Sequence, residues 1–185
     1  ETQNKKHEDD HPSSDSQNDN KMKHVLILGD SMIKNVEGWR IGRSTKTRTQ
    51  VKSFPGAFVS DCYDYFKPPL KCSPDEIVVH IGTNDLKTSS ARNTAESIVD
   101  LAQWLETLLP FAKISLSELT CRDDFEGSKH KVAETNKILG KFCQQNKWNV
   151  ISHLNIDESC LNRSRLHLNK KGTGLLSSNF IKSIN

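Results

Sequence analysis

Four positions far apart in the chain have the side-chain or backbone types that acyl transfer requires. Ser31 supplies a hydroxyl and His167 an imidazole, which pair as nucleophile and general base in covalent catalysis. The backbone N–H groups of Ser31 and Gly56, with the side-chain amide of Asn84, are donors suited to an oxyanion hole. Each residue also has an ordinary structural explanation, as a helix cap, a turn glycine, a turn residue or a loop histidine. Their placement along the chain decides between the two interpretations.

Two of these positions directly follow apolar segments. One segment ends at Gly29-Asp30-Ser31 and another ends at Gly82-Thr83-Asn84-Asp85. A short apolar run that ends at a glycine is typical of a strand buried on both faces. The sequence therefore predicts strands at 24–28, 47–54, 76–81, 112–119 and 149–152, and helices at 32–39, 57–66, 93–109, 128–145 and 172–184, with Pro68-Pro69 ending the second helix.

Strands that alternate with helices predict a parallel sheet with helices on both faces. We therefore expect an α/β protein, a three-layer α/β/α sandwich around a five-stranded parallel sheet. The carboxyl ends of parallel strands lie at one edge, where ligands bind in open α/β sheets. Ser31, Gly56 and Asn84 each follow such an end, and the loop after the last strand leads to His167. The four positions are thus predicted to meet, which favours the catalytic interpretation. A flavodoxin-type phosphate binder is disfavoured, because no glycine-rich loop follows the first strand.

Composition separates a polar tail from one ordered domain. The chain has 185 residues, of which 34% are hydrophobic, and residues 1–22 are almost entirely polar or charged. Such a segment buries too little apolar surface to order itself, so we expect a disordered tail at 1–22 and one domain at 23–185. No apolar run suits a membrane span, and five cysteines without a Cys-x-x-Cys pattern favour a reducing, intracellular and cytoplasmic setting. A net charge of +3 gives a nucleic-acid partner only weak support, despite the cluster of Arg163, Arg165, Lys170 and Lys171.

The Gly29-Asp30-Ser31 turn, Gly56, the Gly82-Thr83-Asn84-Asp85 run and His167 together resemble the four sequence blocks of the SGNH (GDSL-type) hydrolase superfamily. The resemblance spans residues 24–184 and implies a flavodoxin-like sandwich that deacylates small esters through a serine, without a metal or other cofactor. It implies Ser31 as nucleophile, His167 as base, and an oxyanion hole from Ser31, Gly56 and Asn84. Asp30, Gly82, Thr83 and Asp85 would support them. The segments around Ser115 and His167 also resemble SGNH domains carried in animal retroelement proteins.

One position departs from that pattern. The family places an aspartate three residues before the histidine, and this chain has Ser164 there, between Arg163 and Arg165. A serine hydroxyl can orient an imidazole but cannot neutralise an imidazolium. Replacing the triad aspartate of a serine protease by its amide lowers turnover by ~10⁴. The two flanking arginines would lower the affinity of His167 for a proton if they faced it.

Three interpretations follow from this departure. The chain is a slow Ser–His dyad enzyme in which a backbone carbonyl orients His167, or it borrows a carboxylate from Asp157, Glu158 or Asp123. Alternatively, it is a catalytically idle SGNH-fold module for binding or assembly, such as part of a mobile-element protein. Two further assignments are structural. His80 is expected to be a hydrogen-bonded core histidine, and Arg122-Asp123-Asp124 is expected to cap the next helix and form ion pairs.

Overall fold

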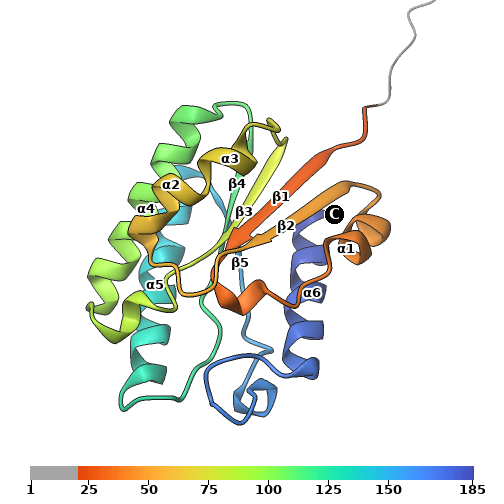
Figure 1. The fold of residues 1–185 in the computed structure, drawn as a ribbon. Coiled ribbons are helices and arrows are strands. Elements are labelled where there is room, and N and C mark those ends of the chain that lie inside the picture. Colours follow the sequence, from red (N-terminus) through yellow and green to blue (C-terminus); the bar gives the residue numbers. More distant parts are fainter. Residues whose placement is uncertain (1–20) are drawn as a thin grey trace, which may run out of the picture.

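The computed structural model describes residues 21–185, so the predicted tail at 1–22 lies almost wholly outside the described residues. Five parallel strands form one sheet in the order β2-β1-β3-β4-β5 (Figure 1). This confirms the predicted α/β fold with a five-stranded parallel sheet. The strands are β1 (His24–Gly29), β2 (Arg48–Ser53), β3 (Glu76–His80), β4 (Lys113–Ser117) and β5 (Asn149–Ile151).

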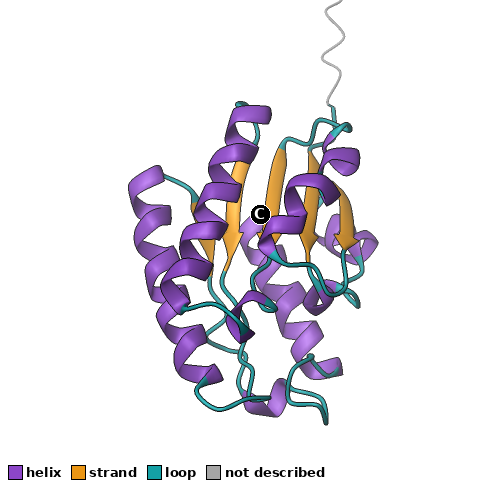
Figure 2. Ribbon diagram, turned by 60° about the vertical axis from the view of Figure 1, so that its left-hand side comes forward, coloured by secondary structure: helices purple, strands orange, loops and turns teal. Residues whose placement is uncertain are grey.

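Helices cover both faces of the sheet, which gives three layers (Figure 2). On one face, α1 (Gly38–Thr45) and α6 (Lys170–Ile184) pack against the strands. The opposite face carries α2 (Cys62–Tyr65), α3 (Lys67–Leu70), α4 (Ala91–Leu108) and α5 (Ser128–Asn146).

Within residues 21–185 no helix combines the length and apolarity that a membrane crossing needs.

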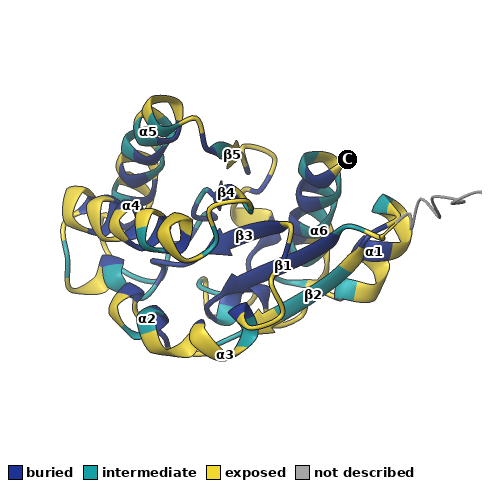
Figure 3. Ribbon diagram, turned by 90° about the horizontal axis from the view of Figure 1, so that it is seen from above, coloured by how far each residue is buried: buried dark blue, intermediate teal, exposed yellow. Residues whose placement is uncertain are grey.

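The core consists of two apolar layers separated by the sheet. Successive residues of a strand point to opposite faces. In β1, Leu26 and Leu28 therefore join the layer under α4, while Val25 and Ile27 join the layer under α6. All four side chains are fully buried, as the continuous apolar run predicts, and Figure 3 shows β1 and β3 as buried strands between helices that are only partly exposed.

Two of the predicted helices differ from the structure. The helix predicted at 32–39 is a single 3₁₀ turn, η1 (Ser31–Ile33), and the α-helix begins only at Gly38. Asp30 caps the start of this turn by accepting a hydrogen bond from the Met32 N–H at 2.9 Å. A side chain at position 38 would lie 2.8 Å from the backbone oxygen of Thr49, so a glycine there lets α1 pack closely on β2.

The helix predicted at 57–66 is divided into η2 (Val59–Asp61) and the short helix α2. Pro68 and Pro69 do not end a helix as predicted, because both lie in the first turn of α3. Proline is tolerated there, since the N–H groups of a first helical turn have no intrahelical partner. Two further 3₁₀ turns are η3 (Asp85–Lys87) and η4 (Glu158–Cys160).

Candidate active site

Ser31 lies in the turn that leaves the carboxyl end of β1. Gly29 is required there, because a Cβ would lie 2.2 Å from the backbone oxygen of His80 on the neighbouring strand. The Asp30 carboxylate holds the turn by accepting hydrogen bonds from the N–H groups of Met32, at 2.9 Å, and Thr83, at 3.3 Å. Burial raises the pKa of Asp30 to about 6, although these two hydrogen bonds oppose the rise. Asp30 therefore connects the Ser31 turn to the loop that follows β3.

His167 lies in a small hairpin just before α6. Leu161 and Leu168 form an antiparallel bridge, and the Asn162 N–H donates to the His167 carbonyl at 2.7 Å. Asn169 caps α6 by accepting a hydrogen bond from the Gly172 N–H at 3.0 Å. These contacts fix the backbone on both sides of His167. Its Nε2 lies 3.0 Å from the Oγ of Ser31, 136 residues away in the chain.

Gly56 and Asn84 lie in two loops that are bonded to each other. The Asn84 Nδ2 donates to the Ala57 carbonyl at 2.8 Å. The Val59 N–H donates to the carboxylate of Asp85, at 3.2 and 3.3 Å from its two oxygens. Gly56 has φ +83, a conformation that favours glycine. The loops after β2 and β3 therefore form one unit beside the Ser31 turn.

Glycine is also required at position 82, the second residue of the loop after β3. Its φ is +113, and a Cβ there would lie 2.8 Å from the Cδ1 of Ile98 on α4. Because Gly82 has no Cβ, the loop packs closer to α4 than it could with any other residue at position 82.

Ser164 does not take the place of the missing aspartate. Its exposed hydroxyl donates to the side-chain oxygen of Asn162 at 2.6 Å, and it has no hydrogen bond to His167. Among residues 21–185, no hydrogen-bond partner faces the Nδ1 of His167. Arg163 and Arg165 are both exposed, so the condition under which they would lower the affinity of His167 for a proton is not met.

The three carboxylates considered as substitutes are bonded elsewhere. Asp157 caps η4 by accepting from the Ser159 N–H at 2.9 Å. Asp123 and Glu158 both form ion pairs with Arg165 and with Lys129. The borrowed-carboxylate interpretation therefore finds no support in the hydrogen bonds of the described residues.

The surroundings of His167 disfavour its protonated form. Partial burial lowers the pKa of His167 first, and the nearby charge of Lys34 lowers it further. Arg122 and Lys87 act in the same direction, and only Asp124 opposes them. The imidazole is therefore held in the neutral form that can accept a proton. An imidazolium formed during a reaction would lack an adjacent carboxylate.

A buried arginine supports the Asn84 loop from the other side. The Nε and Nη2 of Arg122 each donate to Asp124 at 2.7 Å, and its Nη1 donates to the Thr83 carbonyl. The guanidinium also stacks on Phe125, 4.7 Å from the ring centre. The predicted ion pair is thus present, but the predicted cap is wrong, because the N-cap residue of α5 is Gly127. Sequence reasoning missed the contact with Thr83, since nothing marks an arginine as buried.

Two buried histidines flank Ser117 beneath the site. The Ser117 hydroxyl lies 2.8 Å from His80 Nδ1 and 2.7 Å from His153 Nε2. His80 is therefore a core histidine as expected, but its buried Nε2 has no partner among the described residues. Burial lowers the pKa of His80 to about 3 and that of His153 to about 4. Neither imidazole is hydrogen-bonded to Ser31. Within the described residues, no group of three or more His, Cys, Asp or Glu side chains is arranged to hold a metal ion.

Comparison with known proteins identifies the fold. No protein-family model matches the chain, and no curated protein matches it. Solved structures do match, at 15–18% identity in the three cases that follow. A lipase/acylhydrolase from Enterococcus faecalis has 18% identity and a TM-score of 0.71, over 88% of this chain and 95% of that one. A GDSL-like lipase from Bacteroides thetaiotaomicron has 17% identity and a TM-score of 0.70, over 88% and 87%. A catalytic mutant of an acetylxylan esterase from Geobacillus stearothermophilus has 15% identity and a TM-score of 0.70, over 88% and 94%. The described domain therefore has the fold of the GDSL-type lipases and acylhydrolases.

Proposed function

We propose that residues 23–185 form one SGNH-type domain, a serine-dependent hydrolase of small acyl esters such as acetates. The observation that carries this proposal is the 3.0 Å contact between Ser31 Oγ and His167 Nε2. The fold shared with lipases, acylhydrolases and an acetylxylan esterase supports an ester as the substrate. The match of the sequence blocks supports the same assignment. A retroelement origin rests on sequence resemblance alone.

In the proposed reaction, Ser31 Oγ attacks the carbonyl carbon of the ester while His167 Nε2 accepts the hydroxyl proton. The resulting tetrahedral intermediate collapses, the bond to the alcohol oxygen breaks, and His167 donates its proton to that oxygen. The acyl group is then bound to Ser31. Water attacks this acyl-enzyme with His167 again as the base, which releases the acid and restores the serine. The lowered pKa of His167 suits its role as base at neutral pH.

We assign the oxyanion hole to the N–H groups of Ser31 and Gly56 and to the side-chain amide of Asn84. Among residues 21–185, the first two groups have no backbone acceptor. The Ala57 carbonyl accepts one hydrogen of the Asn84 amide and so supports a fixed amide plane with a second hydrogen to donate. Donors that are fixed before the reaction stabilise developing charge without reorganising.

The proposed enzyme works as a Ser–His dyad. Without a carboxylate partner the imidazolium is less stable, so turnover is expected to be slow. Loss of one triad member in a serine protease still leaves ~10³-fold catalysis over water. Ser31→Ala removes the nucleophile itself and should lower the hydrolysis of an activated acetate ester by several orders of magnitude, while Ser60→Ala, at an exposed serine, should not. Equal rates in wild type and Ser31→Ala would overturn the proposal.

The second candidate is the idle binding or assembly module. The Nδ1 of His167 without a partner and the exposed position of Ser164 favour it. It predicts no ester hydrolysis and no labelling of Ser31. Its nucleic-acid version further predicts binding that weakens steeply as salt rises, because neutralised phosphates release counterions. Binding that is equal at low and high salt would exclude that version.

A further inference from the structure

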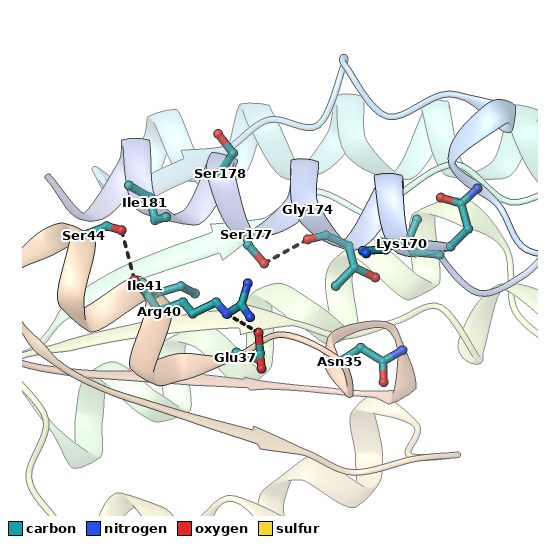
Figure 4. A pocket seen from close by; sticks show the side chains of 13 residues that line it. Asn35, Glu37, Arg40, Ile41, Ser44, Lys170, Gly174, Ser177, Ser178 and Ile181 are labelled. Atoms are coloured by element: carbon teal, nitrogen blue, oxygen red, sulfur yellow. Dashed lines mark hydrogen bonds and ion pairs between the residues drawn. The ribbon is translucent and has the colours of Figure 1, made fainter.

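A groove of about 720 Å³ lies between α1 and α6 (Figure 4). Its apolar surface comes from Ile41, Leu168 and Ile181. Asn35, Thr173 and Ser178 supply polar groups along it. Neither Ser31 nor His167 lines the groove, so it is a separate space rather than the site already described.

One end of the groove adjoins the catalytic pair. Leu168 follows His167 directly, and Asn35 lies in the loop that continues from the Ser31 turn. Figure 4 shows Asn35 and Lys170 at one end of the groove and Ser44 and Ile181 at the other. The groove therefore ends at the two chain segments that carry Ser31 and His167.

The chemistry of the proposed reaction decides which part of an ester would occupy this groove. His167 must donate its proton to the leaving oxygen, so the alcohol part has to lie on the His167 side. The oxyanion donors at Gly56 and Asn84 lie in the loops after β2 and β3, whereas α1 and α6 cover the opposite face of the sheet. The groove that begins next to His167 is thus placed for the alcohol part.

The lining of the groove indicates the kind of alcohol. A hydrocarbon chain would bury Asn35, Thr173 and Ser178 without hydrogen-bond partners, which is unfavourable. The hydroxyls of Ser44 and Ser177 already donate to their own helices but can still accept. A strongly anionic ligand is disfavoured too. The Arg40 guanidinium is paired with Glu37, which leaves Lys170 without an ion pair in the described part of the chain.

We infer that the groove between α1 and α6 binds a neutral, polyhydroxylated alcohol, such as a glycosyl unit, as the leaving group of the ester. The aliphatic side chains would contact the C–H faces of a sugar ring, and the amide and hydroxyl groups would bond its hydroxyls. The leaving-group role rests on the proposed function. The binding of a saccharide does not, so the two are tested separately.

Gly174 offers a way to fill the groove without disturbing the fold. It lines the groove in the middle of α6, and a Cβ added there meets nothing within 4 Å. Gly140 on α5 is a matched control, since a Cβ there also meets nothing within 4 Å and it does not line this groove. Gly174→Leu and Gly140→Leu therefore make the same change inside and outside the groove.

Binding is measured first, by calorimetric titration of unesterified cellotetraose into the wild type and both variants. Wild type and Gly140→Leu should bind alike, and Gly174→Leu should bind about tenfold or more weakly, because the leucine fills space that the ligand needs. Asn35→Ala should weaken binding severalfold by removing a hydrogen-bonding group. Absence of binding to the wild type, equal binding to Gly174→Leu, or displacement of the saccharide by 1-octanol would overturn the inference.

Hydrolysis assays test the leaving-group role of the groove separately from the proposed esterase activity. Gly174→Leu should lower kcat/KM for acetylated cellotetraose about tenfold and leave that for ethyl acetate nearly unchanged. Equal losses on both esters would contradict the leaving-group role. If the wild type binds cellotetraose in a Gly174-dependent way but hydrolyses neither ester, the proposed function fails and the saccharide site stands.

Discussion

The hydroxyl of Ser164 donates its hydrogen bond to Asn162 and leaves the ring of His167 without support from that side. We therefore predict that Ser164→Ala changes kcat/KM for an activated acetate ester by less than about twofold, since no contact with the reacting groups is lost. His167→Ala should abolish the same activity. A loss of about tenfold or more in Ser164→Ala would mean that Ser164 turns toward His167 during the reaction.

The pH dependence of hydrolysis should report the surroundings of His167. The neutral imidazole is the active base, so kcat/KM should be constant near neutral pH and fall as the pH drops through the lowered pKa of His167. Lys34→Gln removes one charge that lowers this pKa and should move the acidic limb to higher pH. Lys182→Gln, on the exposed surface of α6, should leave the limb in place. A limb that moves to lower pH in Lys34→Gln would contradict the electrostatic account.

The buried arginine should matter for stability. Arg122→Met leaves the Asp124 carboxylate and the Thr83 carbonyl without their donor. Breaking a buried ion pair at one partner typically costs several kcal/mol, and we expect a loss of about 3 kcal/mol in the free energy of unfolding. Arg92→Met breaks only the exposed pair with Glu96 and should cost less than about 1 kcal/mol. Denaturant unfolding curves measure both, and equal effects would show that Arg122 is not a structural anchor.

Acid should destabilise the domain partly through His80 and His153. Both have a lowered pKa in the folded protein, about 3 and about 4, whereas the ordinary value is about 6.5. Between these values the unfolded chain binds protons that the folded chain does not, so stability falls as the pH drops from about 6.5 toward 4. The raised pKa of Asp30, about 6, acts in the opposite direction over part of this range.

A variant isolates the histidine contribution. His153→Gln removes one titrating group and should reduce the loss in unfolding free energy between pH 7 and pH 5. Measured by chemical denaturation at the two pH values, this loss should stay the same in His130→Gln, because His130 is exposed on α5. An unchanged loss in His153→Gln would show that His153 is already protonated in the folded protein.

Much of the fold could be predicted because the signals were local. The continuous apolar runs of β1 and β3 predict buried strands, and both runs end at loops that carry the candidate residues. Parallel strands necessarily bring such loops to one edge. The same reasoning predicts that Ser31 lies near His167.

The remaining features depend on contacts that a single sequence does not display. The helix predicted after Ser31 is only one 3₁₀ turn, which Asp30 caps at its start by accepting a hydrogen bond from the Met32 N–H and which ends at Lys34. Arg122 is buried because Thr83 and Asp124 accept its hydrogen bonds, and the apolar pattern of the sequence does not predict these contacts. The groove beside His167 exists only through the packing of α1 and α6.

The central claim is that Ser31 is a nucleophile activated by His167. The most direct measurement is mass spectrometry after reaction with a fluorophosphonate, which couples to an activated serine hydroxyl. We expect one adduct, on the peptide that contains Ser31, and its loss in His167→Ala. An adduct that forms equally in His167→Ala, or a folded wild-type protein that gives none at Ser31, would contradict it.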